Sequence, residues 1–162
     1  LRLTSAIHTK QKQIKRYKRS GIISEKDITI IALNGKDVPL SVTDRTVPRI
    51  VRCLFPIGNL TLSFDKEINS FTDYHYKPNF ITHKSNESQG EVRFDHFLTN
   101  EYSHISGILY SIVDVFNMPS KIGNDLTLVA NPYASTKLQK EFLTVGQEFH
   151  LEGEQLINRQ YS

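Results

Sequence analysis

The chain has almost no cysteine and no long apolar run. Cys53 is the only cysteine among 162 residues, which excludes an internal disulfide and any metal site built from several cysteines. Because Cys53 lies in the largely apolar run 50–55, we expect it to be a buried small side chain rather than a nucleophile. No run reaches the roughly 18 apolar residues of a membrane helix, and no signal-peptide apolar core follows the basic N-terminus. We therefore predict a cytoplasmic protein without a membrane partner.

Other recognisable features are also missing. The sequence has no phosphate-binding glycine loop, no internal repeat and no low-complexity tract. With 38% apolar and 23% charged residues, the composition is that of an ordinary globular domain, and the length is sufficient for one core. We expect an α/β to α+β fold, with a mixed central sheet, few helices, an N-terminal basic helix packed on the sheet and a β-rich C-terminal extension.

The chain starts at Leu1 without an initiator methionine and enters a helix almost at once. This start indicates the C-terminal portion of a longer protein whose N-terminal segment is missing. We expect residues 1–162 to form a single domain. Within it, residues 1–58 would be a helix-and-strand portion and residues 59–162 a β-rich extension.

Positive charge is concentrated near the N-terminus. The formal net charge is only +3, but six of the twenty Lys and Arg residues fall between Lys10 and Arg19. On a helix over residues 3–20, with about 100° per residue, one arc holds Leu3, Ala6, Ile7, Ile14 and Tyr17, and also Lys10 and Gln13. The opposite, cationic side would hold Lys12, Lys15, Arg16, Lys18 and Arg19.

Hydrophobic periodicity and turn residues predict the remaining elements. Gly21 stands where a C-cap glycine would end the helix, and Gly107 permits a bulge or a close backbone approach. Residues 28–34 are apolar at almost every position, as in a central strand covered on both faces. The further expected elements are a helix over 48–55, a half-buried strand over 60–64, its partner over 71–80, a short strand or turn over 91–98, core strands over 104–113 and 126–130, a helical turn over 138–142 and a hairpin over 149–156. Loops are expected over 38–46 and 85–90.

A short motif on the basic helix suggests a function. Gln13-Ile14-Lys15-Arg16-Tyr17 fits the pattern Q-x-x-x-Y, with a buried strand about ten residues later. It resembles the motif that follows the catalytic strands in RecB-like members of the PD-(D/E)xK nuclease superfamily. In that family a carboxylate pair and a lysine on two preceding strands bind a divalent metal, and the helix glutamine and tyrosine help to place the DNA. The resemblance carries over Lys10, Gln13 and Tyr17 as supporting site residues.

Further segments extend the resemblance over nearly the whole chain. They are similar to the latter part of a group of uncharacterised bacterial proteins, in which a nuclease-like D…E-x-K/T signature lies upstream. The segments are 1–7, 31–35, 48–51, 55–58, 105–111, 123–125 and 131–134. No such signature precedes the helix here. The resemblance therefore implies a DNA-binding C-terminal portion of a restriction or defence protein. The complete protein would hydrolyse phosphodiesters with Mg²⁺, and this chain alone, without a metal ligand set, would be inactive.

Three alternatives stay open. The helix is also compatible with an ordinary structural role, in which Lys10 extends along the apolar stripe and Tyr17 simply packs. A non-catalytic interaction domain would bind another protein through exposed strand edges and the aromatic segment 71–80. A homodimer is a separate expectation about partners. A small-molecule enzyme would need a deep pocket converging on His75, His83 or His96.

The remaining chemical groups give weaker signals. Asp73, His75 and His83 would share one strand face, whereas Asp95 and His96 on a strand would point to opposite faces. Asp65 and Glu67 are expected in a turn, and His104 is expected to be structural. Neither Ser106 nor Ser111 has the glycine pattern of a nucleophile elbow.

Overall fold

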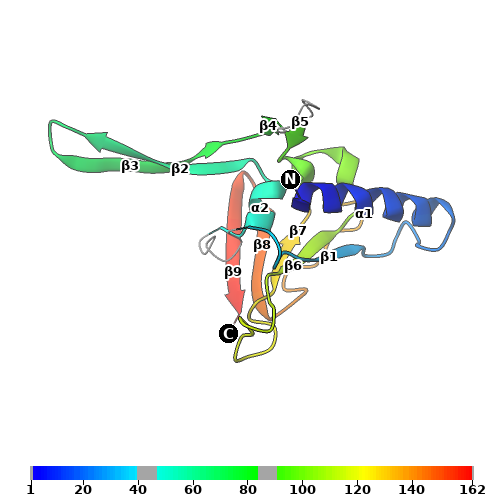
Figure 1. The fold of residues 1–162 in the computed structure, drawn as a ribbon. Helices are drawn as coiled ribbons and strands as arrows, with labels where there is room; N and C mark the ends of the chain where they lie inside the picture. Colours follow the sequence, from blue (N-terminus) through cyan, green and yellow to red (C-terminus); the bar gives the residue numbers. More distant parts are fainter. Residues whose placement is uncertain (1, 40–46, 84–90, 162) are drawn as a thin grey trace.

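The computed structural model describes residues 2–39, 47–83 and 91–161, except for the side chains of residues 59, 60, 74 and 81–83. Five strands form one mixed sheet in the order β1, β6, β7, β8, β9 (Figure 1). The strands are β1 (Ile30–Asn34), β6 (Gly107–Ser111), β7 (Thr127–Ala130), β8 (Gly146–Glu152) and β9 (Gln155–Tyr161). The pairs β1–β6 and β7–β8 are parallel, and the pairs β6–β7 and β8–β9 are antiparallel. The expected mixed sheet with few helices is confirmed.

One face of this sheet carries the core. The strand register places Ile31, Ile108, Val129 and Phe149 in a single row across four strands, and all four side chains are buried. Helices α1 (Arg2–Arg19) and α2 (Arg49–Leu54) contribute apolar side chains to the same core. Because successive strand residues alternate between faces, the neighbouring row, which includes Leu128 and Glu148, points to the opposite side.

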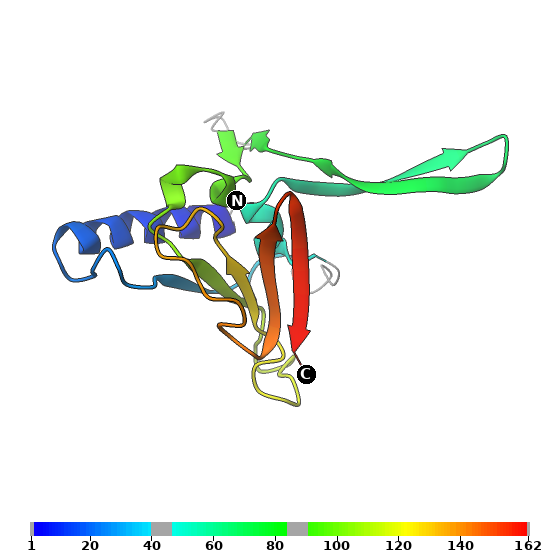
Figure 2. The same cartoon turned by 180° about the vertical axis from the view of Figure 1, so that it is seen from behind.

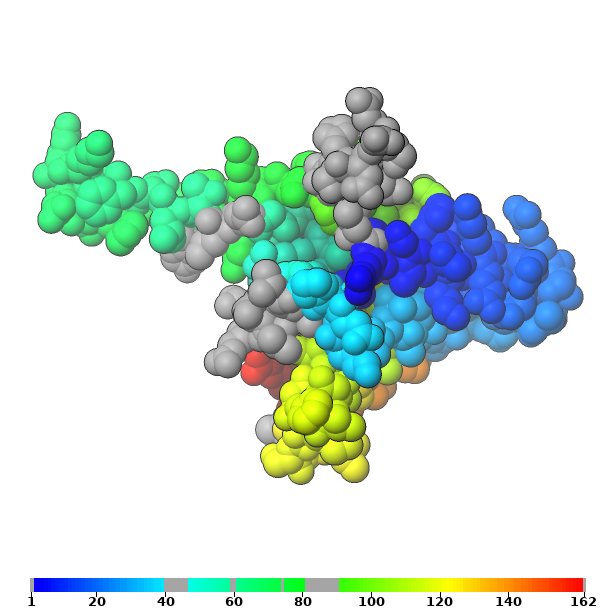
Figure 3. Space-filling view, viewed as in Figure 1, coloured from blue at the N-terminus to red at the C-terminus, as the bar shows by residue number. Residues whose placement is uncertain are grey.

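Two small sheets lie outside the main one. Strands β2 (Ile57–Asp65) and β3 (Ser70–Pro78) form a hairpin that projects far from the body of the molecule (Figures 1 and 3). Strands β4 (Ile81–His83) and β5 (Glu91–Arg93) form a short antiparallel pair. Two 3₁₀ turns, η2 (His96–Leu98) and η3 (Asn100–Tyr102), then lead to β6 beside α1.

Local signals predict several elements correctly. Helix α1 agrees with its predicted bounds to within one residue at each end, and Gly21 follows it with a φ of +73°. The helix predicted over 48–55, the strands over 104–113 and 126–130 and the terminal hairpin are all present. A Cβ on Gly107 would lie 2.9 Å from the Val129 carbonyl oxygen and 2.7 Å from a Leu138 methyl group, so the expected close approach is also confirmed.

Three expectations are wrong. The first strand is an edge strand and not a central one, since among the described strands β1 pairs only with β6, and Ala32 is exposed. The strand predicted over 60–64 is present in β2 but does not bury its apolar face, because Leu62 and Phe64 are 55% and 48% exposed. Residues 138–142 form no helical turn but an irregular segment with Glu141 at a φ of +61°. The loop expected over 85–90 lies outside the described residues, as does most of the loop expected over 38–46.

Candidate nucleic-acid interface

Helix α1 brings the three residues of the predicted motif together. The Lys10 ammonium donates to Gln13 Oε1 over 3.4 Å, and Gln13 Nε2 donates to the Tyr17 phenol oxygen over 2.6 Å. Spacings of three and four residues put the side chains on one flank of the helix. The hydrogen bond from Gln13, and more weakly the nearby Arg16, lowers the pKa of the Tyr17 phenol. The guanidinium carbon of Arg16 lies 5.7 Å from the centre of the Tyr17 ring.

This flank is not the buried stripe that the sequence predicts. Lys10 is exposed and Gln13 is half-buried. The buried amide is Gln11, which is only 2% exposed and donates to the Glu101 carbonyl oxygen over 3.3 Å. The buried face is therefore rotated toward Thr4 and Gln11, and η3 supplies the Glu101 carbonyl that accepts from Gln11.

The solvent face of α1 is strongly cationic. The helix has seven Lys and Arg residues and no Asp or Glu, so it carries more positive charge than the formal +3 of the whole chain. Four of these cations lie on the outward side and form no ion pair with a carboxylate within the described residues. They are Lys12, Lys15, Arg16 and Arg19; Lys15 is half-buried and the other three are exposed.

Lys18 does not belong to this face. Its side chain is only 4% exposed, and its ammonium lies 3.3 Å from a carboxylate oxygen of Glu25. The expected position of Lys18 on the outward side of the helix is therefore wrong. At about 100° per residue, position 18 lies close to the direction of Ile7 and Gln11, so its chain runs along the core before the charge meets Glu25.

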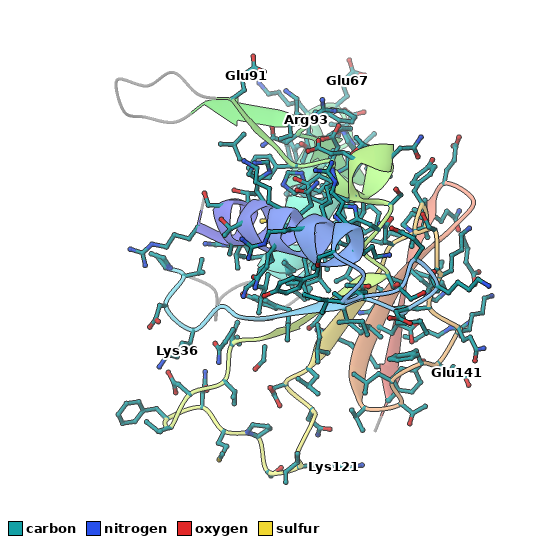
Figure 4. All side chains as sticks on the ribbon, turned by 90° about the vertical axis from the view of Figure 1, so that its right-hand side faces the viewer. Lys36, Glu67, Glu91, Arg93, Lys121 and Glu141 are labelled. Atoms are coloured by element: carbon teal, nitrogen blue, oxygen red, sulfur yellow. The ribbon has the colours of Figure 1, made fainter. Side chains whose placement is uncertain are left out.

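A pocket of about 370 Å³ opens at the N-terminal end of α1. Its lining includes His8 of α1, Arg93, Asp95, His96 and Tyr102. Arg93 binds Asp95 through two hydrogen bonds, and this pairing lowers the pKa of the Asp95 carboxyl. Figure 4 shows Arg93 and Glu91 together above α1.

His96 is a half-buried residue of this pocket. Its ring stacks on Tyr102 with centroids 4.7 Å apart, and its buried Nε2 atom has no hydrogen-bond partner among the described residues. Burial lowers the pKa of His96 and raises the pKa of Tyr102 to about 12. The small-molecule hypothesis required a deep pocket converging on His75, His83 or His96. Of these three histidines, His96 lines this pocket, and the hypothesis stays untested. Asp95 and His96 lie at the start of a 3₁₀ turn, not on a strand.

The other sequence candidates do not form a joint site. Asp73 and His75 are exposed on the projecting hairpin, with 3.5 Å between carboxylate and ring, while the His83 side chain lies outside the described residues. Asp65 caps a turn by accepting from the Glu67 backbone N–H, as predicted. Within the described ranges, no three His, Cys, Asp or Glu side chains are placed to share a metal ion.

Three further candidates have contacts or burial that fit a structural role: Ser106, His104 and Cys53. Ser106 Oγ accepts from the Thr29 backbone N–H, which ties β6 to the segment before β1. Burial lowers the pKa of His104, and Cys53 is buried in the core as expected.

Sequence reasoning missed His8, Arg93 and Tyr102, which come from separate elements and meet only in the folded pocket. It also missed Glu148 and His150 on β8, both of which are buried. The signal that could have found the second pair is Glu148-Phe149-His150-Leu151-Glu152, where three ionisable residues alternate with apolar ones on a strand.

Among the described residues, no helix combines the length and the apolar character needed to cross a membrane. Comparison of the chain with protein-family models, with curated proteins and with solved structures finds no match. The resemblance to PD-(D/E)xK nucleases therefore stays a prediction, and the case for any function depends on the geometry of α1 and its surroundings.

Proposed function

We propose that the chain binds DNA through the outward face of α1, which we define as Lys12, Lys15, Arg16 and Arg19. The observation that carries the proposal is the set of four cations on one helix face with no carboxylate partner in the described structure. Unpaired cations at fixed spacing are suited to phosphate, since their binding releases the counterions condensed on DNA. Lys12 and Arg19 are about 10 Å apart along the helix axis, at ~1.5 Å per residue.

The hydrogen-bonded chain of Lys10, Gln13 and Tyr17 borders this face. Amide, ammonium and phenol groups donate hydrogen bonds to phosphate oxygens and to base edges. In the proposed complex the outward face attracts the DNA electrostatically. The hydrogen-bonded side chains of Lys10, Gln13 and Tyr17 then fix the position of the DNA on the helix. Metal-dependent hydrolysis with Mg²⁺ would belong to a longer protein of the restriction or defence type, as the resemblance implies.

The test is a binding titration with a labelled DNA duplex in low salt. Changing all four residues of the outward face to alanine should weaken binding about tenfold or more, because several phosphate contacts are lost together. The matched control changes four other exposed lysines to alanine, which removes the same charge elsewhere: Lys36, Lys66, Lys77 and Lys121. Figure 4 shows Lys36 and Lys121 below α1, on the side away from Arg93 and Glu91. Equal losses of DNA affinity in both variants would show that affinity depends only on the net charge of the protein, and would contradict a defined interface on α1.

A second candidate function follows from the projecting hairpin. Near its turn, Leu62, Phe64, Ile68 and Phe71 are between 48% and 66% exposed, and the rings of Phe64 and Phe71 pack edge to face at 5.2 Å. Exposed apolar clusters of this kind mark protein contacts. The occupant that we propose for this surface is a second copy of the chain.

Sedimentation velocity over a range of concentrations tests this second function. A dimer that dissociates when Leu62, Phe64 and Phe71 are all changed to threonine would support it. Threonine is β-branched and favours strands, so the hairpin should persist. A monomeric wild type at all concentrations would contradict self-association.

A further inference from the structure

A second polar site lies on the face of the sheet opposite α1. Glu148, His150 and Glu152 alternate along β8, so their side chains share this face. The segment that links β7 to β8 crosses over it (Figure 2). Between the two lies a pocket of about 210 Å³, lined in part by Asn131, Lys137, Lys140, Glu148 and His150.

Glu152 is the outermost of these three residues on β8, and two cations lie close to its carboxylate. The Lys140 ammonium lies 2.8 Å from Glu152 Oε1, and a guanidinium nitrogen of Arg159 lies 3.8 Å from the same atom. The hydrogen bond from Lys140, followed by that from His150, lowers the pKa of Glu152. Figure 4 shows Glu141, a second ion-pair partner of Arg159, beside β8 and β9 and away from Arg93.

The contact with Glu152 orients the ring of His150. Nε2 of His150 lies 3.1 Å from Glu152 Oε1, and the same oxygen lies 2.8 Å from the Lys140 ammonium. Since a carboxylate only accepts hydrogen bonds, the ring donates a proton from Nε2. In that tautomer the lone pair is at Nδ1, on the other side of the ring.

That lone pair points to a second carboxylate. His150 Nδ1 is buried and has no hydrogen-bond partner in the described part of the chain, and it lies 3.8 Å from Glu148 Oε1. The two side chains are only 9% and 3% exposed. The other oxygen of Glu148 accepts from the Tyr161 phenol over 3.4 Å. An imidazole lone pair and a carboxylate oxygen that face each other away from water repel, and a cation between them would remove the repulsion.

We propose that Glu148 and His150 bind a divalent transition-metal ion of the zinc class at this pocket. Metal-binding histidines commonly donate their other ring N–H to a carboxylate, which orients the ring and increases its basicity. Glu152 has this role here. Metal–nitrogen and metal–oxygen bonds of about 2.1 Å span ~3.4 Å between the two ligand atoms at a tetrahedral angle. The observed 3.8 Å needs a closure of only a few tenths of an ångström.

The ligand chemistry selects the kind of ion. An imidazole nitrogen with a carboxylate oxygen suits Zn²⁺ or Co²⁺, whereas Mg²⁺ and Ca²⁺ prefer all-oxygen sites. Two protein ligands leave the remaining coordination positions to water from the pocket. The site is therefore expected to bind metal more weakly than a closed structural zinc site, and to remain open to a ligand.

The first test uses Zn²⁺ titration calorimetry and Co²⁺ absorption on protein stripped with a chelator. We expect one ion per chain and a visible Co²⁺ band, with affinity reduced at least tenfold in both Glu148→Gln and His150→Gln. His75→Gln, which alters an exposed histidine on the hairpin, is the matched control and should bind like the wild type. Excess Mg²⁺ should not compete. Loss of affinity in His75→Gln alone, or none in the Glu148 and His150 variants, would overturn the proposal.

A measurement on the unmodified chain covers the case in which a variant does not fold. Proton–nitrogen correlation spectra of the histidine rings should show one Nδ1 resonance, unprotonated at neutral pH, that shifts when Zn²⁺ is added. If His150 Nδ1 is protonated and Zn²⁺ does not displace that proton, a proton lies between Nδ1 and Glu148 in place of a metal ion. This result would overturn the metal site.

Discussion

Gln13 Nε2 donates a hydrogen bond of 2.6 Å to the phenol oxygen of Tyr17, one turn further along α1. This contact is the largest cause of the lowered pKa of Tyr17, because a donor to the phenol oxygen stabilises the phenolate. Changing Gln13 to methionine removes the donor and keeps the length of the side chain. We expect the pKa of Tyr17 to rise in this variant.

Absorbance titration of the tyrosines measures this change. Tyr17→Phe identifies which of the seven tyrosines contributes the early transition. An unaltered titration curve in Gln13→Met would show that the contact does not persist in solution.

The apolar row across the sheet should determine stability. Ile108 lies in the middle of that row and is fully buried. Ile108→Ala should lower the free energy of unfolding by about 2–5 kcal/mol, since it leaves a cavity where two neighbouring strands and a helix meet. Urea unfolding measures the loss. Ile28→Ala, at a position that is 43% exposed, is the matched control, and a cost as large as that of Ile108→Ala would contradict the described core.

Asn131 holds the connection before β6. It is 2% exposed, and its amide donates to the carbonyl oxygens of Tyr102 and Ile105 over 3.0 and 2.9 Å. Asn131→Ala should cost about 1–3 kcal/mol, because the Ile105 carbonyl loses this donor, whereas the Tyr102 carbonyl still accepts from the Ile105 backbone N–H. The exposed Asn124 provides the comparison, as Asn124→Ala removes a similar amide without buried partners. Thermal unfolding measures the melting temperature of both variants. Equal melting temperatures for Asn131→Ala and Asn124→Ala would contradict the structural role of Asn131.

His96 should make stability depend on pH in mildly acidic solution. Burial lowers its folded-state pKa below the ordinary value of 6.5. The unfolded chain therefore takes up the proton first as the pH falls, and the stabilising contribution that is present above pH 6.5 is lost as the pH drops through the folded-state pKa. Burial also lowers the pKa of His104.

Unfolding free energies at about pH 7.5 and pH 5 test this expectation. The wild type should lose more stability between the two values than His96→Gln does. Asp95, whose carboxyl pKa is lowered by Arg93, titrates at more acid pH and does not interfere. Equal losses in wild type and variant would mean that His96 is not desolvated.

Local sequence signals account for the helices and most strands, because capping, periodicity and turn residues act over a few positions. They do not determine strand order. The apolar run 28–34 predicts a central strand, yet β1 lies at the edge, since its only partner in the sheet is β6, more than seventy residues later. Likewise, the alternation in β2 indicates a strand correctly, but burial of its apolar side depends on a covering element that a local pattern cannot reveal.

The candidate interface could be predicted in part. The cationic cluster follows from composition and helical spacing, and the association of Lys10, Gln13 and Tyr17 follows from their separations. The inward direction of Lys18 follows from the same spacing, which puts it beside Ile7, although we expected it on the outward side. The contacts of Gln11 with the Glu101 carbonyl and of Lys18 with the Glu25 carboxylate could not be predicted, because these partners belong to other segments. The contact between Glu148 and His150 lies within one strand, but its burial depends on the segment between β7 and β8.

The salt dependence of DNA binding tests the central claim most directly. The logarithm of the binding constant should fall linearly with the logarithm of the salt concentration in the wild type, since each phosphate contact releases counterions. Changing Lys12, Lys15, Arg16 and Arg19 to alanine should reduce the slope by roughly 3 to 4 for duplex DNA, about one for each lost contact, whereas Lys18→Ala should leave it nearly unchanged. A slope that is the same in the wild type and in the variant with all four changes would contradict DNA binding through α1.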